Sequence, residues 1–267
     1  MNNRIYFFTG TGNSLKVAKD IATTLPECEI VAICKGMDFE IPTDYERIGF
    51  VFPVYFWGVP DMVVEFIRKA NFTKKSAKYY FAVATQGGFL DNISIIQTRN
   101  LFSEKGLHLD YGGKVKMNAN FVAWYDMSNF ALKLALKAYD KRINVVLQDI
   151  RNTKTNDSTH ISKSKEQRYM KAIGSVHERD FNYNVSNECI SCGTCENVCP
   201  AGNITLKDGH PVFHHQCQCC MACIQHCPKK AINYNNKTQK RRRYTHPEIG
   251  YVEIIKYYKK SEVENHH

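Results

Sequence analysis

The chain has 267 residues, 43% of them hydrophobic, which supplies a core for one large domain or two modest ones. Its net charge is +10, and its eleven cysteines are spread unevenly. No long apolar segment follows Met1, as a secretory signal would require, and no run approaches the roughly 18 apolar residues of a membrane span. We therefore expect a cytoplasmic protein without a membrane span, in which clustered cysteines indicate metal or redox chemistry.

The first half of the chain alternates strand-like and helix-like segments. Helical spacing of apolar residues predicts four helices between and after short apolar runs, and strands separated in this way are typical of a parallel sheet with helices on both faces. We therefore expect an α/β fold with a five-stranded parallel sheet. The predicted strands span residues 4–8, 29–34, 47–54, 79–85 and 108–118, and the predicted helices span residues 15–25, 60–70, 92–105 and 130–150.

The turn after the first predicted strand is rich in glycine and hydroxyl groups, and it opens a helix. It reads Thr9-Gly10-Thr11-Gly12-Asn13-Ser14. Hydroxyl and backbone N–H groups at the start of a helix form an anion site. The turn lacks the Gly-Lys-Ser/Thr ending of a nucleotide P-loop and the third glycine of a dinucleotide fingerprint.

Two more loops follow the third and fourth predicted strands. They read Pro53-Val54-Tyr55-Phe56-Trp57-Gly58 and Thr85-Gln86-Gly87-Gly88. Ligands of open α/β sheets bind at the carboxyl ends of the strands. The first turn can thus hold a phosphate while these two loops cover a planar ring, although each loop taken alone is compatible with a structural role.

The three loops together resemble those of flavodoxin, over about residues 1–150. The resemblance implies a flavodoxin-like, FMN-binding domain at residues 1–155 with helices on both faces of the sheet. It implies that Thr9, Thr11, Asn13 and Ser14 hold the FMN phosphate. Residues 55–58 would then flank one face of the flavin ring, and residues 85–88 would cover the other.

Residues 156–184 are polar and lysine-rich, and they form a predicted linker that is partly helical over residues 163–173. The cysteine-rich segment at residues 185–236 follows, and residues 237–267 form a basic C-terminal tail. The basic side chains of this tail are either a solvated surface or a docking patch for an acidic partner. They are Lys237, Lys240, Arg241, Arg242 and Arg243.

Nine of the eleven cysteines lie between residues 189 and 227, in a motif that occurs twice. Cys189-x-x-Cys192-x-x-Cys195-x-x-x-Cys199-Pro200 recurs 28 residues later as Cys217-x-x-Cys220-x-x-Cys223-x-x-x-Cys227-Pro228. Three cysteines at this spacing can wrap a loop around one cubane cluster, and the fourth lies where the chain turns away. Zinc sites usually use separated pairs of ligands instead. The motif therefore indicates iron–sulfur clusters of the 4Fe–4S type.

The repeat resembles the two-cluster bacterial ferredoxins over residues 187–234, a small α+β domain in which the fourth cysteine of each motif ligates the other cluster. Cys219 sits beside Cys220, and its use as a ligand would break the triplet spacing, so we expect its thiol to face away from the cluster. The resemblance implies one cluster on Cys189, Cys192, Cys195 and Cys227, and a second on Cys217, Cys220, Cys223 and Cys199.

The two modules in this order resemble the flavodoxin–ferredoxin fusion proteins of anaerobic bacteria, whose Arg-Tyr-x-His-Pro tail matches residues 243–247. The resemblance implies an electron carrier that relays electrons between two 4Fe–4S clusters and FMN, with ferredoxin-type proteins as donor or acceptor. One alternative is an FMN-dependent reductase of a small substrate, with Tyr55, Tyr125 or His108 as proton donor. Another is a redox-sensing or nucleic-acid-binding protein that uses the basic tail, although no nucleic-acid-reading motif accompanies it.

Overall fold

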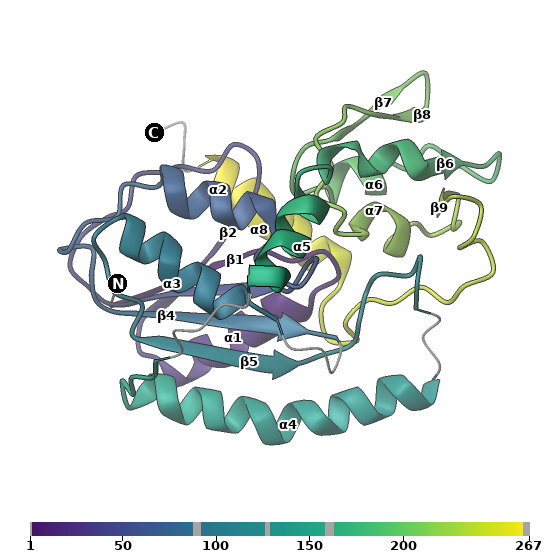
Figure 1. Cartoon of the computed structure of the whole chain (residues 1–267). Coiled ribbons are helices and arrows are strands. Elements are labelled where there is room, and N and C mark those ends of the chain that lie inside the picture. The colour runs from purple at the N-terminus through teal and green to yellow at the C-terminus, as the bar shows by residue number, and fades with distance from the viewer. Residues whose placement is uncertain (1, 88–91, 126–128, 158–162, 264–267) are drawn as a thin grey trace.

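The computed structural model describes residues 2–87, 92–125, 129–157 and 163–263. Its centre is a five-stranded parallel sheet with strand order β2-β1-β3-β4-β5 (Figure 1). This is a doubly wound, flavodoxin-like order, so the predicted fold class is confirmed. The strands are β1 (Asn3–Phe7), β2 (Cys28–Ala32), β3 (Tyr45–Pro53), β4 (Ala77–Gln86) and β5 (Tyr111–Lys116).

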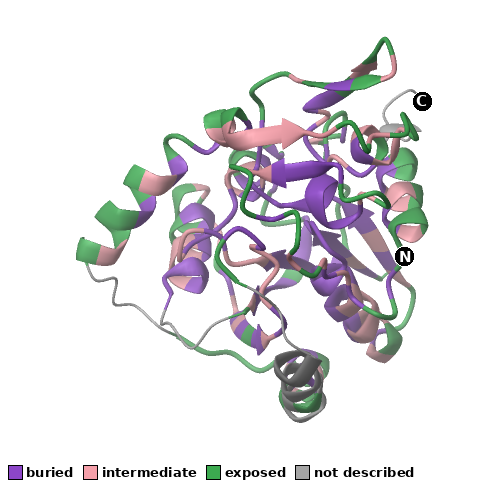
Figure 2. Ribbon diagram, turned by 90° about the vertical axis from the view of Figure 1, so that its right-hand side faces the viewer, coloured by how far each residue is buried: buried purple, intermediate pink, exposed green. Residues whose placement is uncertain are grey.

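Strand β3 at the centre of the sheet and its neighbour β4 are mostly apolar, as is typical of strands with helices over both faces. Gly49 in β3 pairs with Phe81 in β4, and a β-carbon at Gly49 would lie 2.0 Å from the Phe81 ring. Glycine at this point therefore lets a large ring pack across the strand. Residues 48–52 of β3 and 79–85 of β4 are buried throughout, and Figure 2 colours the chain by burial.

Helices lie on both faces of the sheet. The side chains of α1 (Asn13–Thr24) and α4 (Asn129–Arg151) pack on one face, and those of α2 (Asp61–Lys69) and α3 (Ser94–Glu104) on the other. The second face holds an aromatic cluster in which the ring centroids of Tyr6 and Phe66 are 4.9 Å apart and those of Phe50 and Phe102 are 5.4 Å apart. Burial of each such ring contributes roughly 1.5–3 kcal/mol to stability.

The cysteine-rich unit, residues 183–234, lies beyond the carboxyl ends of the strands (Figure 1). It follows α5 (Lys163–Ile173) and the short 3-10 helix η1 (His177–Asn182). Its two short helices start 28 residues apart, so the sequence duplication is also a structural one. The unit comprises β6 (Tyr183–Val185) paired with β9 (Ile232–Tyr234), β7 (Ile204–Lys207) paired with β8 (His210–Phe213), and the helices α6 (Thr194–Asn197) and α7 (Ala222–Gln225).

The C-terminal tail folds back onto the central sheet. It ends in α8 (Tyr251–Val263), a helix that the sequence interpretation did not predict, which packs beside β2. Two ion pairs fix its position: Lys19 with Glu253 at 2.6 Å and Lys260 with Glu29 at 3.2 Å. None of the helices in the described ranges has the length and apolarity needed to cross a membrane.

Candidate cofactor sites

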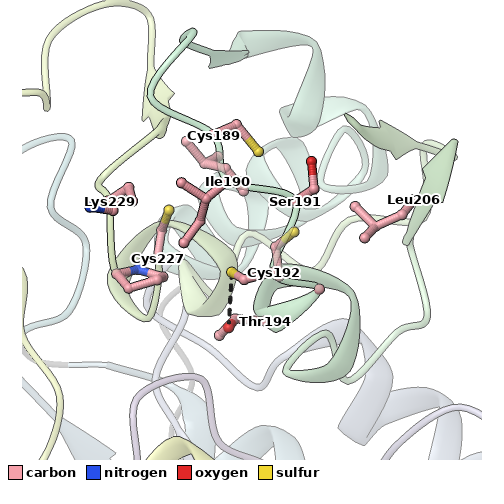
Figure 3. Close-up of a pocket in the computed structure, with 12 residues that line it drawn as sticks. Cys189, Ile190, Ser191, Cys192, Thr194, Leu206, Cys227 and Lys229 are labelled. Atoms are coloured by element: carbon pink, nitrogen blue, oxygen red, sulfur yellow. Dashed lines mark hydrogen bonds between the residues drawn. The ribbon is translucent and has the colours of Figure 1, made fainter. Parts of the chain in front are cut away.

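Four cysteines from both halves of the repeat surround one small cavity (Figure 3). The loop can turn around this cavity because Ser191 and Gly193 have left-handed backbone conformations, with φ of 56° and 72°. The thiol of Cys192 lies 3.4 Å from the hydroxyl of Thr194. Cys227, the fourth cysteine of the second motif, lines this cavity together with the three cysteines that begin the first motif. This first thiol ring consists of Cys189, Cys192, Cys195 and Cys227.

A second cavity has the same construction, with the halves of the repeat exchanged. Cys219 and Met221 take the left-handed conformations here, with φ of 52° and 63°. The N–H of Asn203 donates to the Cys199 sulfur at 3.3 Å, and 28 residues later the N–H of Ala231 donates to the Cys227 sulfur at 3.2 Å. The second thiol ring consists of Cys217, Cys220, Cys223 and Cys199.

The duplication accounts for Cys219, the cysteine outside the spacing. It occupies the position of Ser191 in the first motif, and both residues have the left-handed backbone that turns the loop. Cys219 is absent from the lining of the second ring and lines a different, larger cavity instead. Its side chain therefore faces away from the ring, as a spare thiol would.

The two rings differ in their exposure to water. Burial raises the pKa of Cys217 to about 11 and holds the pKa of Cys220 well above its ordinary value. In the first ring burial also raises the pKa of Cys195 to about 11, but hydrogen bonding to Thr194 lowers the pKa of the exposed Cys192. In the described ranges, no three His, Cys, Asp or Glu side chains form a group that could hold a single metal ion. Each set of four thiols instead stands around a cavity, as the corners of a cube-shaped cluster require.

The larger cavity, of about 340 Å³, lies at the carboxyl ends of the strands, and we call it the loop cavity. All three loops predicted from the sequence line it, which is what their positions after β1, β3 and β4 require. The predicted residues on its wall are Thr9, Gly10, Thr11, Asn13, Ser14, Pro53, Val54, Tyr55, Phe56, Trp57, Thr85, Gln86 and Gly87.

The glycine-rich turn, residues 9–14, is held from within by polar contacts. The N–H of Gly12 donates to the Thr9 hydroxyl at 3.1 Å, and the hydroxyls of Ser14 and Thr85 lie 2.9 Å apart. The Thr11 hydroxyl is buried on the cavity wall without a hydrogen-bond partner. A buried, unpaired hydroxyl costs free energy, so this turn is suited to a ligand with acceptor atoms.

Other predicted residues stand apart from the loop cavity. Gly12 and Gly58 are not on its wall, and a β-carbon at Gly58 would lie 2.3 Å from the side-chain oxygen of Gln97. The close neighbours of Gly58 give it a packing role, and the contact of either glycine with a ligand stays a prediction. His108 precedes β5, at the amino end of that strand, and does not line the cavity. Gly88 lies outside the described residues.

Sequence reasoning missed nearly half of the cavity wall. The segment after β5 could have been found, because it also follows the carboxyl end of a strand. Arg179, Cys219 and Tyr234 carried no local signal, since they reach the cavity from far along the chain. Tyr125, named from the sequence as a candidate proton donor, is on the wall, and the missed residues are Asn92, Met117, Asn118, Ala119, Asn120, Phe121, Trp124, Ala172, Arg179, Cys219 and Tyr234.

Comparison with known proteins agrees with this division of the sites. A family model described as a flavodoxin domain matches residues 4–93, and one described as a 4Fe-4S dicluster domain matches residues 188–232. The chain carries a flavodoxin domain and a 4Fe–4S dicluster domain. These two domains support an iron–sulfur flavoprotein that takes part in electron transfer.

Individual relatives resemble the chain over part of its length. The polyferredoxin protein MvhB of Methanothermus fervidus is 33% identical over 51 residues, which cover 19% of this chain and only 12% of the relative. An FMN-dependent NADH-azoreductase of Bacillus anthracis is 10% identical over 57% of this chain and 100% of its own, with a TM-score of 0.39. A flavodoxin of Streptococcus pneumoniae is 15% identical over 54% of this chain and 98% of its own, with a TM-score of 0.37.

Two adjacent residues of the dicluster domain lie between the loop cavity and the second thiol ring. Cys219 lines the loop cavity, and its neighbour Cys220 lines the second thiol ring. The Cys220 carbonyl accepts a hydrogen bond from the Asn120 side chain at 3.3 Å and lies against Gly10, where a β-carbon would be 2.3 Å from that oxygen. Gly10 is therefore needed for the close approach of the dicluster backbone.

Proposed function

We propose that this chain binds FMN in the loop cavity and two 4Fe–4S clusters in the thiol rings, and relays electrons between them. One observation carries the proposal: the loop cavity and the second ring share the Cys219–Cys220 wall. When bound, FMN exchanges two electrons singly or together, whereas each cluster exchanges one. A cavity that adjoins a thiol ring so closely favours direct exchange between the two cofactors.

The residues of the loop cavity fit FMN. Its volume of about 340 Å³ is that of a bound small-molecule cofactor. The unpaired hydroxyl of Thr11 and the start of α1 at Asn13 suit the phosphate. Tyr55, Phe56 and Trp57 provide aromatic surface for the flavin ring.

The environments of the rings suggest different roles for the two clusters. The second ring is buried and adjoins the loop cavity, so its cluster would exchange electrons with FMN. The first ring lies nearer solvent, since Cys192 is exposed and the neighbouring Ile190 is 55% exposed. We assign the first ring to exchange with an external one-electron carrier of the ferredoxin type.

A second candidate function is the reduction of a small substrate at FMN. It is supported by the rim of the loop cavity, where Trp124 and Tyr125 are 72% and 45% exposed and would remain accessible to a planar molecule. Tyr125 would be the proton donor in that case. The two functions differ in turnover: a reductase consumes a substrate that reaches the cavity, and a carrier does not.

Anaerobic purification with analysis of iron, acid-labile sulfide and flavin tests the cofactor set. We expect about eight irons and one FMN per chain. Zinc in place of iron would refute the proposed 4Fe–4S clusters, and the absence of flavin would refute FMN binding in the loop cavity. Rapid mixing with a reduced ferredoxin tests the relay itself, because cluster signals should change before flavin absorbance does.

A further inference from the structure

The C-terminal tail holds the glycine-rich turn of the flavodoxin domain from outside the loop cavity. The Tyr244 hydroxyl donates to the Asn13 side-chain oxygen at 2.7 Å. The His246 N–H donates to the Thr11 carbonyl at 2.8 Å, and the Tyr258 hydroxyl donates to the Thr9 carbonyl at 2.8 Å. Three alternate residues of the turn are thus bonded to the tail.

The contacts are buried and closely packed. Tyr244, His246 and Tyr258 are each at most 4% exposed. A β-carbon at Gly12, whose φ is 93°, would lie 2.8 Å from the Ile249 side chain. The tail therefore covers the back of the turn and determines that glycine stands at its centre, a role distinct from ligand contact.

Asn13 connects the tail to the cavity wall. Its side chain lines the cavity, accepts the Tyr244 hydroxyl and donates through its amide nitrogen to the Asn118 carbonyl at 2.9 Å. The Asn13 Oδ1 accepts from the Tyr244 hydroxyl, and the Asn13 Nδ2 donates to the Asn118 carbonyl. These two bonds fix the orientation of the Asn13 amide. Without the Tyr244 hydroxyl, the buried oxygen of Asn13 would lose its partner and the side chain could turn.

The same tail is bonded to the dicluster domain. The Tyr244 N–H donates to the Gln225 side-chain oxygen at 2.8 Å, and Arg243 donates to the carbonyl of Ile232 at 3.1 Å. Arg241 instead donates to the carbonyl of Val122, in the segment after β5, at 2.7 Å. Two residues of the basic run are thus engaged within the molecule.

We infer that the tail is part of the phosphate site, with Tyr244 as a positioning residue that acts through Asn13. This inference rests on the proposed binding of FMN. Tyr244 does not line the cavity, so its effect on a ligand passes through the orientation of Asn13 and the shape of the turn. The effect should therefore concern the phosphate and spare the flavin ring.

The test compares FMN with riboflavin, which lacks the phosphate. Full-length protein with its clusters in place and its flavin removed is titrated with each ligand, and binding is followed by flavin fluorescence. We expect Tyr244→Phe to weaken FMN binding about three- to tenfold, as the loss of one buried hydrogen bond would, and to change riboflavin binding less than about twofold. Tyr251→Phe is the matched control, since Tyr251 is 44% exposed on the same tail.

A second variant separates positioning from general damage. In an Asn13→Ala background, which lacks the bonded amide, Tyr244→Phe should have no further effect on FMN binding. Unchanged FMN affinity in Tyr244→Phe would overturn the inference, as would an equal loss for FMN and riboflavin. Failure of the unaltered protein to bind either flavin would refute the proposed function instead, whatever the variants do.

Discussion

Gly10 and the carbonyl oxygen of Cys220 are so close that a β-carbon on Gly10 would lie 2.3 Å from this oxygen. This contact joins the turn of the flavodoxin domain to the loop of the second thiol ring. The contact limits the distance between the two candidate cofactors. It is made by backbone atoms on both sides, so no side chain can move to relieve a clash.

Gly10→Ala should therefore separate the two domains locally. We expect the free energy of unfolding to fall by about 1–3 kcal/mol, the usual cost of overpacking, and electron transfer between cluster and flavin to slow. Denaturant unfolding and rapid mixing measure the two effects. Gly250→Ala is the matched control, since nothing lies within 4 Å of a β-carbon there. Equal behaviour of the two variants would contradict this account of the contact.

The exchange of fourth cysteines between the rings predicts a pattern of iron loss. Cys199→Ser should reduce iron from about eight to about four per chain by removing the cluster of the second ring. Adding Cys217→Ser, in the same ring, should cost no more iron. Adding Cys189→Ser, in the first ring, should remove the remainder. Iron analysis with electron paramagnetic resonance of the reduced protein distinguishes this pattern from uncrossed ligation, in which the two double variants would exchange results.

Arg179 brings a positive charge to the loop cavity. Its guanidinium carbon lies 5.2 Å from the centre of the Phe56 ring, and its Nε is buried without a partner. A cation at this wall favours the more negative, reduced form of a bound flavin. Arg179→Gln should lower the midpoint potential of FMN by about 30 mV, equivalent to about 1.4 kcal/mol for two electrons.

The matched control for Arg179 is Arg168→Gln. Arg168 lies over the Trp57 ring at 5.3 Å, but it does not line the cavity. Its removal should leave the potential within a few millivolts of the original value. A spectroelectrochemical titration gives both numbers, and a shift of the same size in the two variants would show that Arg179 acts only through the net charge of the protein.

The ionisation of Glu29 should make the free energy of unfolding depend on pH. Its carboxylate lies 2.6 Å from Arg4 and 3.2 Å from Lys260 of α8. Burial alone would raise the pKa of Glu29, but the two cations outweigh burial and hold it below its ordinary value. A lowered pKa stabilises the fold above the unfolded pKa of about 4.3, and this contribution disappears as pH falls through the folded value.

Glu29→Gln should therefore cost about 1.5–3 kcal/mol of unfolding free energy at neutral pH, the usual range for hydrogen bonds to a charged group. The difference between the two proteins should shrink as the pH falls below about 4. Urea unfolding at several pH values measures it. Glu248→Gln is the control, because Glu248 is 65% exposed and its pair with Lys16 contributes little. A difference that stays constant with pH would contradict the assignment.

The sequence predicted the features that have a local cause. Apolar runs such as residues 48–52 identified the strands, and the 28-residue repeat grouped eight cysteines into two equivalent motifs. The carboxyl-end rule brought together three loops that are distant in sequence. The helix α8 was also within reach, because Tyr251, Ile254 and Tyr258 have helical spacing.

The remaining site residues could not be predicted, because their roles depend on how the domains dock. Cys219 lies on the cavity wall where the dicluster domain packs against Gly10, and Arg179 reaches the same wall from η1. Tyr244 belongs to the Arg-Tyr-x-His-Pro motif, but its bond to Asn13 spans most of the chain. No periodicity or spacing within either segment indicates this contact.

The bond between Tyr244 and Asn13 also has a consequence for the order of events during synthesis. The glycine-rich turn leaves the ribosome early, and the residues that support it from behind are translated only after both cysteine motifs. The turn is therefore present in the nascent chain long before Tyr244, the residue that holds Asn13 from behind. A chain interrupted before residue 244 would lack this bond and the packing of α8 beside β2, so on the inference above it should bind FMN more weakly than the full-length chain.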